Sequence, residues 1–191
     1  IALVIAFLGV YLFAKNTVDS VAKDTVWHNI SVDDMSVAGM KDTEVKALLE
    51  QKQAEFGATT VVLKAEEAKV EVLLSDLGFA IANIDEVVTD AVSYGKDGGV
   101  FSRYKEFKAL EENALAFDLE YKVDPALVAD VINAQLPEME NSAKDATITR
   151  ENGKFVITDE VIGVTVDPEA SVEVIETYFK EGLAVTQNRF N

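Results

Sequence analysis

The chain has 191 residues, of which 49% are hydrophobic and 27% charged, a composition typical of a globular rather than a disordered protein. Its formal net charge of −17 argues against nucleic acid as a partner, because a nucleic-acid binder needs a basic surface. The absence of cysteine excludes disulfides, thiolate metal sites and cysteine nucleophiles within this chain. His28 is the single histidine and therefore excludes any site that needs two imidazoles.

The first fourteen residues, IALVIAFLGVYLFA, carry no charged side chain. As a helix they would span roughly 21 Å, whereas a bilayer core is about 30 Å thick and needs about 20 residues. Because the chain begins with Ile1 rather than methionine, we expect residues 1–14 to be a truncated transmembrane anchor or the core of a signal peptide. The remaining alternative is a buried apolar helix of a soluble domain. Either membrane interpretation places the chain from Lys15 onward outside the cytoplasm, as a single-pass protein of the cell membrane.

Residues 15–26 are polar and lack a clear core face, which predicts a juxtamembrane spacer before a folded part that starts near Trp27. A first α+β module is expected over residues 27–122. It opens with a short extended segment that turns at Asp33-Asp34, followed by a helix from Asp42, its expected N-cap, to Gly57. The apolar stripe of that helix is Val45, Leu48, Leu49 and Phe56.

Later in this module the pattern predicts a hairpin of strands 60–63 and 69–74, then a helix over residues 84–94. A glycine-rich break at 95–99 precedes a further helix over 100–114. Residues 117–122 alternate apolar and charged side chains, which predicts one half-buried strand.

A second module is expected over residues 123–182. Asp124-Pro125 predicts a capped helix that runs to Leu136. Strands 146–149 and 155–158 should then turn at Asn152-Gly153, and Asp167 should cap another helix. The expected core face of the first of these helices is Leu127, Val128, Val131 and Leu136. Residues 183–191 are interpreted as the start of a following domain.

The order helix, hairpin, glycine, helix thus occurs twice, with Gly78 and Gly163 in matching positions 85 residues apart. This spacing predicts an internal duplication. The alternative is two unrelated α+β stretches that share common turn residues. The expected fold class is therefore α+β: a tandem repeat of helix–β-hairpin–helix modules with small antiparallel sheets, preceded by the remnant of a transmembrane helix.

Three stretches carry a family resemblance. Residues 30–51, ISVDDMSVAGMKDTEVKALLEQ, resemble the opening motif of peptidoglycan-binding repeats. Residues 91–98 match the pattern A-x-x-x-G-(R/K)-x-G, and residues 153–167 match G-K-F-x-I-x-x-E-x-x-G-x-x-(L/V)-D. Such repeats precede VanW domains in YoaR-like proteins and YkuD-type L,D-transpeptidase domains. The chain departs from the pattern at Asp34, where glycine is usual, and at Lys41, where threonine is usual, so the helix cap is expected to move to Asp42.

The resemblance implies a non-catalytic targeting or spacer module of a VanW-like or L,D-transpeptidase-like protein of Gram-positive bacteria. Its expected partners are peptidoglycan or another cell-wall component, the membrane through the N-terminal helix, and a C-terminal VanW-like or YkuD-like domain. No serine-hydrolase elbow, P-loop, zinc-protease motif or calcium loop occurs in the sequence, so no catalytic, cofactor or metal residue is assigned. The alternative function is protein–protein interaction or self-association through exposed strand edges.

An acidic chain gains no Coulomb attraction from a polyanionic wall, so binding would need a local groove of aromatic rings and cations. Residues 95–104 combine glycines, aromatics and two cations. They predict ligand contacts at Lys96, Phe101, Arg103 and Tyr104, with Trp27 and Tyr94 as further aromatic candidates. The competing interpretation is a connecting loop whose aromatic side chains cover the edge of the core.

Overall fold

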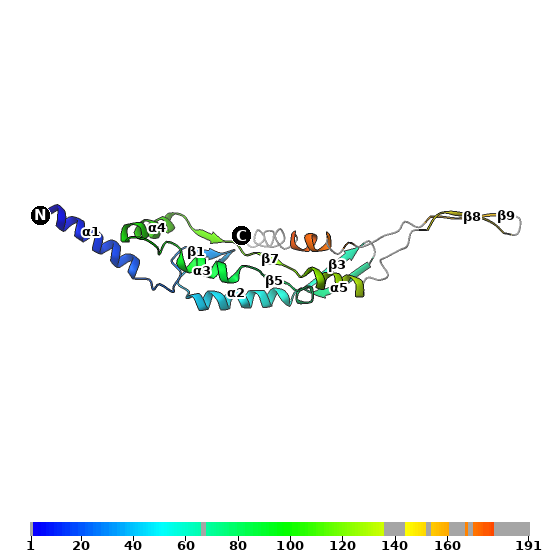
Figure 1. Cartoon of the computed structure of the whole chain (residues 1–191), viewed down its shortest axis with the longest axis horizontal. Coiled ribbons are helices and arrows are strands. Elements are labelled where there is room, and N and C mark those ends of the chain that lie inside the picture. Colours follow the sequence, from blue (N-terminus) through cyan, green and yellow to red (C-terminus); the bar gives the residue numbers. More distant parts are fainter. Residues whose placement is uncertain are drawn as a thin grey trace. The chain divides into compact units, whose positions relative to one another are not determined.

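The structure is a computed structural model that describes residues 2–65, 68–135, 144–151, 154–160, 167 and 170–177 (Figure 1). Its contacts divide the chain into two compact units, and each unit is built from separate stretches of sequence. Unit 1 comprises Ile1–Ala54 and Ile81–Glu120, and unit 2 comprises Glu55–Ala80 and Tyr121–Asn191. The predicted turns at 66–67 and 152–153, Leu136, Gly163 and the segment 183–191 lie outside the described residues.

Unit 1 contains a small mixed sheet and the helices around it. Its elements are α1 (Ala2–Asp19), β1 (Ile30–Val32), β2 (Met35–Ser36), α2 (Asp42–Gly57, which continues into unit 2), α3 (Ile84–Ser93), α4 (Val100–Glu112) and β6 (Leu115–Phe117). The predicted helices at 42–57, 84–94 and 100–114 are therefore confirmed to within two residues at each end. The mixed α+β class is also confirmed.

The strand order in this sheet is β2-β1-β6. β1 pairs antiparallel with β2, as expected for a short turn at Asp33-Asp34. Its other neighbour, β6, is parallel, with Ile30 opposite Leu115. The expected small antiparallel sheets are confirmed in the pairs β1–β2, β3–β4 and β8–β9, but the β1–β6 pair is parallel and was not expected. A parallel pair needs a long crossover, which α2, α3 and α4 provide between β1 and β6.

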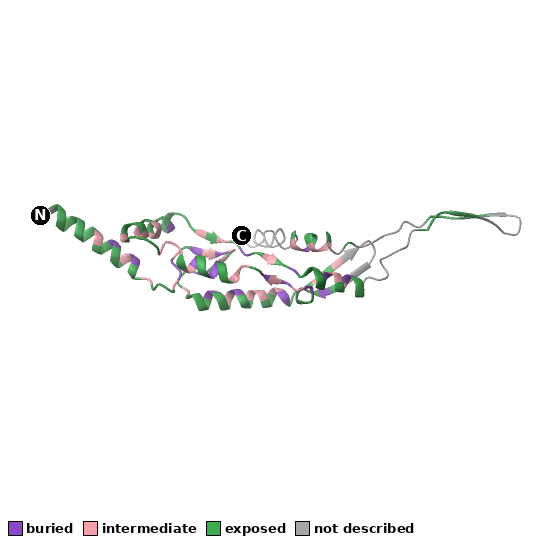
Figure 2. Ribbon diagram, viewed as in Figure 1, coloured by how far each residue is buried: buried purple, intermediate pink, exposed green. Residues whose placement is uncertain are grey.

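The core of unit 1 is formed by apolar residues of α1, β1, α2, α3 and α4 and of the segments that connect these elements (Figure 2). Trp27 is the largest of its fully buried side chains, with 0% exposed. Burying such an aromatic ring removes a large apolar area from water and stabilises the fold. The other buried members are Ala14, Val18, Val26, Ile30, Val32, Val37, Val45, Leu49, Ile81, Val87, Val88, Ala91, Leu110 and Leu119.

Residues 15–26, which were expected to lack a core face, contribute to this core. Val18 and Val26 are both buried, and the backbone N–H of Val26 donates to the Met40 carbonyl at 2.8 Å. The sequence obscured this because the two valines lie eight positions apart in a largely polar segment. The segment is therefore a packed part of unit 1.

The start of α2 differs from the prediction. The Lys41 carbonyl accepts the first helical hydrogen bond, from the Val45 N–H at 2.9 Å, so Lys41 rather than Asp42 is the N-cap. The Glu44 side chain accepts the Lys41 N–H at 2.8 Å, which is half of a capping box. The cap therefore needs no hydroxyl at position 41.

The single strand expected over 117–122 is broken after Phe117. Two side chains replace strand pairing there: the Asp33 carboxylate accepts the Leu119 N–H at 2.9 Å, and the Asn83 carbonyl oxygen accepts the Glu120 N–H at 2.9 Å. Asp33 can do this because it adopts a left-handed conformation with φ 49°. The strand pattern thus splits into β6 and β7 (Tyr121–Lys122).

Unit 2 contains two antiparallel hairpins and the helix α5. Its elements are β3 (Thr60–Ala65), β4 (Ala68–Leu73), the 3-10 helix η1 (Leu74–Leu77), β7, α5 (Pro125–Gln135), β8 (Thr147–Glu151), β9 (Lys154–Thr158) and a helical segment at 170–177; β5 (Ala80–Ile81) begins in it. Both predicted hairpins are confirmed, with Ala65 opposite Ala68 and Glu151 opposite Lys154. The core of unit 2 lies outside the β8–β9 hairpin and consists of Val72, Leu74, Leu77, Phe79, Val123, Val128, Ile132 and Ile175.

The predicted caps of unit 2 are also confirmed. The Asp124 carboxylate accepts the Ala126 N–H at 2.9 Å, and the Asp167 carboxylate accepts the Ala170 N–H at 3.3 Å. The expected core face of α5 is wrong in part, because Leu127 is 39% exposed while Ile132 is buried. The helix is rotated so that Val128 and Ile132, four residues apart, point into the core.

Candidate functional site

The four predicted ligand-contact residues lie in unit 1, after α3 and along α4. Gly95 and Gly98 both have positive φ, 67° and 87°, which reverses the chain between the two helices. A Cβ at Gly95 would overlap the Trp27 ring and lie 3.0 Å from the Cβ of Glu106. Only glycine lets the backbone approach Trp27 this closely, which explains the first glycine of the A-x-x-x-G-(R/K)-x-G pattern.

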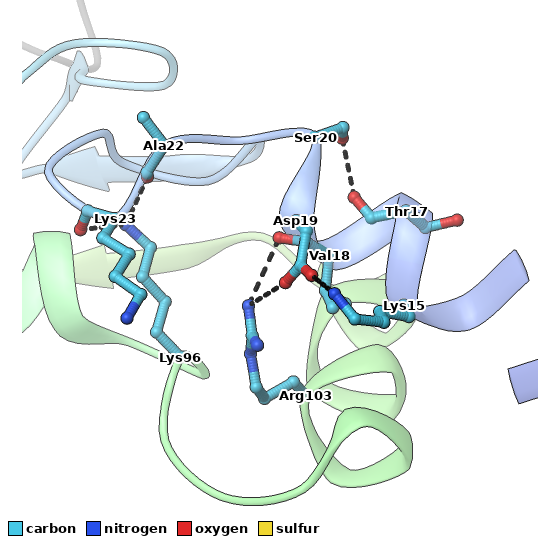
Figure 3. A network of polar contacts seen from close by, with 9 residues as sticks. All are labelled: Lys15, Thr17, Val18, Asp19, Ser20, Ala22, Lys23, Lys96 and Arg103. Carbon is cyan, nitrogen blue, oxygen red and sulfur yellow. Dashed lines mark hydrogen bonds and ion pairs between the residues drawn. The ribbon is translucent and has the colours of Figure 1, made fainter. Parts of the chain in front are cut away.

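Lys96 follows this glycine and turns its ammonium group toward the segment after α1 (Figure 3). Its Nζ donates to the backbone carbonyls of Ala22 at 3.4 Å, Lys23 at 3.0 Å and Thr25. Partial burial lowers the pKa of Lys96, and the nearby Arg103 charge lowers it further against the opposing effect of Asp24. Lys96 therefore holds residues 22–25 in place through charge-assisted hydrogen bonds.

Arg103 makes a second polar contact with α1. Its guanidinium lies 3.2 Å from the Asp19 carboxylate and donates to the Val18 carbonyl at 3.4 Å. Asp19 also accepts a hydrogen bond from Lys15, one turn earlier on α1 (Figure 3). The hydrogen bond from Lys15, together with the charges of Lys15 and Arg103, lowers the pKa of the Asp19 carboxyl.

The two aromatic candidates pack on the apolar part of α1. The Phe101 ring centroid lies 5.6 Å from that of Phe7 and 5.8 Å from that of Tyr11. The Tyr104 ring meets Phe13 edge to face at 6.1 Å. These separations are typical of favourable aromatic pairs.

The structure therefore brings Lys96, Phe101, Arg103 and Tyr104 together, and each of them contacts α1 or residues 22–25. We call this arrangement the α1–α4 junction. Sequence reasoning missed Asp19, the acidic partner of Arg103, although its i,i+4 spacing from Lys15 predicts a surface ion pair. Binding of a wall ligand by these four residues stays a prediction.

The remaining aromatic candidates are used within the fold. Trp27 is fully buried and packs edge to face on Phe107 at 5.2 Å, so its ring is not available to a ligand. The Tyr94 hydroxyl lies 3.4 Å from the Glu106 carboxylate, and burial together with that negative charge raises the pKa of Tyr94.

A shallow hollow of about 610 Å³ lies beside the junction. It is lined mainly by small and apolar side chains, and His28 is its single imidazole; its ring packs on Phe107 at 4.4 Å. Within the described part of the chain, the His28 Nε2 has no hydrogen-bond partner. No group of three or more metal-ligating side chains is placed together among the described residues.

The apolar part of α1 is not buried as a whole, in contrast to the alternative that residues 1–14 form a buried helix of a soluble domain. Most of its large apolar side chains are exposed, including Leu3 at 86% and Phe13 at 64% (Figure 2). Among the described residues, however, no helix has both the length and the apolar character needed to cross a bilayer.

Comparison with known families identifies the class of protein. A family model described as "Putative peptidoglycan binding domain" matches residues 70–185, which is more than half of the chain. The chain belongs to this family. No curated protein and no solved structure matches it. The family description associates the chain with the cell wall and names a binding function rather than a catalysed reaction.

Proposed function

We propose that this chain is a non-catalytic, membrane-anchored module that binds peptidoglycan outside the cytoplasm and positions a following domain near the wall. The family match over residues 70–185 is the observation that carries this proposal. A VanW-like or YkuD-like domain is the following domain that the motif resemblance favours. The uncharged, exposed first part of α1 supports anchoring in the membrane.

The net charge of −17 sets a physical condition on this function. Wall polymers rich in phosphate repel the chain, so binding must come from local contacts with sugar rings and peptide groups. Such contacts should persist at physiological salt, because screening weakens the repulsion as well as any attraction.

The direct test is co-sedimentation of the chain, kept in mild detergent, with purified insoluble peptidoglycan. The measurement is made with and without teichoic acids, at low and at physiological salt. Saturable pelleting that persists at physiological salt is the expected result. Pelleting no greater than that of an acidic control protein would refute wall binding by this chain.

Matched variants decide whether the α1–α4 junction contacts the wall ligand. Tyr104→Ala and Phe13→Ala each break the same ring pair, but from opposite helices. If Tyr104 touches the ligand, only Tyr104→Ala reduces pelleting. Arg103→Ala and Asp19→Ala are matched in the same way, because each removes one partner of the ion pair at 3.2 Å. Equal losses within each pair would instead show that the junction acts only by holding α1.

We also infer that the two helix–hairpin arrangements arose by duplication. In both hairpins the paired strands are joined by two residues, since Ala65 lies opposite Ala68 and Glu151 opposite Lys154. Gly78, which has φ 69° after the first hairpin, corresponds to Gly163 after the second. Under this proposal Gly163→Ala destabilises unit 2 as Gly78→Ala does. A neutral Gly163→Ala variant would contradict the duplication.

Self-association is a second candidate function, and the β8–β9 hairpin is the observation that favours it. In the part of the chain that the structure describes, these strands pair only with each other, which leaves one backbone edge open on each. Ile148 and Ile157 lie directly opposite each other and are exposed at 69% and 67%. An exposed apolar cross-strand pair next to open edges suits strand addition by a second chain.

Sedimentation velocity in detergent tests this second function. If the hairpin mediates association, the chain shows a concentration-dependent increase in sedimentation coefficient that Ile148→Lys abolishes. Thr158→Lys, opposite Thr147 at the end of the same hairpin farthest from its turn, is the control and should leave association intact. A coefficient that is independent of concentration would exclude self-association over the range measured.

A further inference from the structure

The first part of α1 exposes apolar side chains in every direction. Leu3, Val4 and Ile5 are successive residues, so their side chains point roughly 100° apart around the helix, and they are exposed at 86%, 70% and 65%. Leu8, Val10 and Leu12 extend this exposed surface along the helix. A partner protein in a groove covers one side of a helix, whereas lipid surrounds it, and a helix that is apolar all round belongs in such a medium.

The start of α4 lies at the same level as this apolar segment. The Phe101 ring contacts both Phe7 and Tyr11, so it lies alongside the uncharged part of α1. Phe101 itself is 42% exposed. The apolar surface of α1 therefore continues onto the first turn of α4.

The first charged side chains of α1 and of α4 lie close together in space. The first charge on α1 is Lys15, and the first charge on α4 is Arg103. Both are ion-paired with Asp19 (Figure 3). Two helices separated by more than 80 residues of sequence thus change from uncharged to charged in one cluster. Such a coincidence is expected where both helices pass from lipid into water.

We propose that the first turn of α4, with Phe101 at its centre, inserts into the headgroup region of the phospholipid bilayer that α1 enters. This proposal rests on the membrane anchoring proposed above, and it adds a second lipid contact that fixes unit 1 against the membrane surface. The Phe101 ring lies beside Phe7 and Tyr11, which precede Lys15 on α1 by eight and four residues. Phe101 is therefore roughly 6–12 Å deeper than Lys15, measured along the axis of α1.

That depth matches the boundary between headgroups and acyl chains, where aromatic side chains are enriched. Lys15, Asp19 and Arg103 then lie at the water side of the boundary. With two cations and one anion, this cluster carries a small net positive charge. It can therefore attract phosphate headgroups although the chain as a whole is acidic. Without its contact to α4, α1 would connect flexibly to the fold; with it, unit 1 has one orientation on the membrane.

The absence of cysteine makes a depth measurement direct, because a single introduced cysteine carries the only label. The chain is reconstituted in vesicles of phosphatidylcholine and phosphatidylglycerol with an environment-sensitive fluorophore at Phe101→Cys. Quenching by lipids that carry a spin label near the headgroup is then measured. Leu8→Cys is the positive control on α1, and Glu112→Cys, at the far end of α4, is the matched control.

We expect the label at position 101 to be quenched several-fold more strongly than that at 112, with blue-shifted emission. Ser102→Cys, on the same turn, should behave in the same way and guards against a local defect of the Phe101 variant. Quenching at position 8 with none at 101 or 102 would overturn the α4 contact and leave anchoring intact. No quenching at position 8 would refute anchoring itself, and the α4 contact with it.

Discussion

Replacing Gly95 with alanine tests whether the close approach of the α3–α4 connection to Trp27 organises unit 1. Gly95 has φ 67°, and a non-glycine residue in the left-handed region costs about 1–2 kcal/mol. The added Cβ would also overlap the Trp27 ring, and forced overpacking of a core costs about 1–3 kcal/mol. Gly95→Ala should therefore lower the free energy of unfolding of unit 1 by about 2–5 kcal/mol.

Trp27 is the only tryptophan and is fully buried, so its fluorescence reports the unfolding of unit 1. Urea titrations followed by this signal give the midpoint and the slope for each variant. An unchanged slope with a lower urea midpoint would show lost stability rather than a changed unfolded state.

Two neighbouring glycines separate the contributions. Gly98 has φ 87° but its nearest contact for a Cβ is Ser102 at 3.8 Å, so Gly98→Ala should lose only the conformational part, about 1–2 kcal/mol. Gly99 has neither a positive φ nor a neighbour within 4 Å, and Gly99→Ala should cost less than about 1 kcal/mol. If Gly95→Ala lost no more stability than Gly98→Ala, the argument from packing against Trp27 would be refuted.

Three further predictions concern unit 2, the Lys96 contacts and the pH dependence of the junction. A Cβ at Gly78, where φ is 69°, would lie 2.5 Å from the Cβ of Asp124, so Gly78→Ala should destabilise unit 2 by about 2–5 kcal/mol. Amide exchange in α5 should therefore become faster, and unchanged exchange rates would contradict this prediction. Lys96→Met removes the donor to three backbone carbonyls and should cost about 1 kcal/mol; amide exchange at residues 22–25 should accelerate, whereas Lys105→Met should leave it unchanged. Since the pKa of Asp19 is lower in the folded state, its carboxylate contributes stability above the ordinary carboxyl pKa of 3.8, and this contribution is lost as the pH falls through the lowered value. The difference in unfolding free energy between the natural chain and Asp19→Asn should therefore shrink below about pH 4, and a difference independent of pH between 6 and about 2 would exclude this linkage.

Local patterns in the sequence were sufficient for most helices and both hairpins. The stripe of α2 and the Asp124 cap of α5 involve residues within one or two turns of each other, so their physics is contained in a short window of sequence. The family resemblance likewise depends on short motifs, and the family match at residues 70–185 confirms a peptidoglycan-binding family.

Tertiary structure decided what depends on distant partners. The Asp33 carboxylate ends the strand pattern at Leu119 from 86 positions away, and the Asn29 side chain donates to the Leu110 carbonyl across 81 positions. The parallel pairing of β1 with β6 has the same origin. No short stretch of sequence contains both members of such a pair. Periodicity therefore predicts that a strand forms, but not where the strand ends or which strand it pairs with.

The candidate site shows the same division. The sequence grouped Lys96, Phe101, Arg103 and Tyr104 correctly as neighbours, because they follow one another within a turn and the helix after it. It did not show that α1 and residues 22–25 contact all four, since those partners lie more than 70 positions earlier in the chain. Residue type and spacing thus determined which groups gather at the start of α4. Only the packing of α1 against α4 determined what those groups hold, because that contact depends on the path of the whole chain between them.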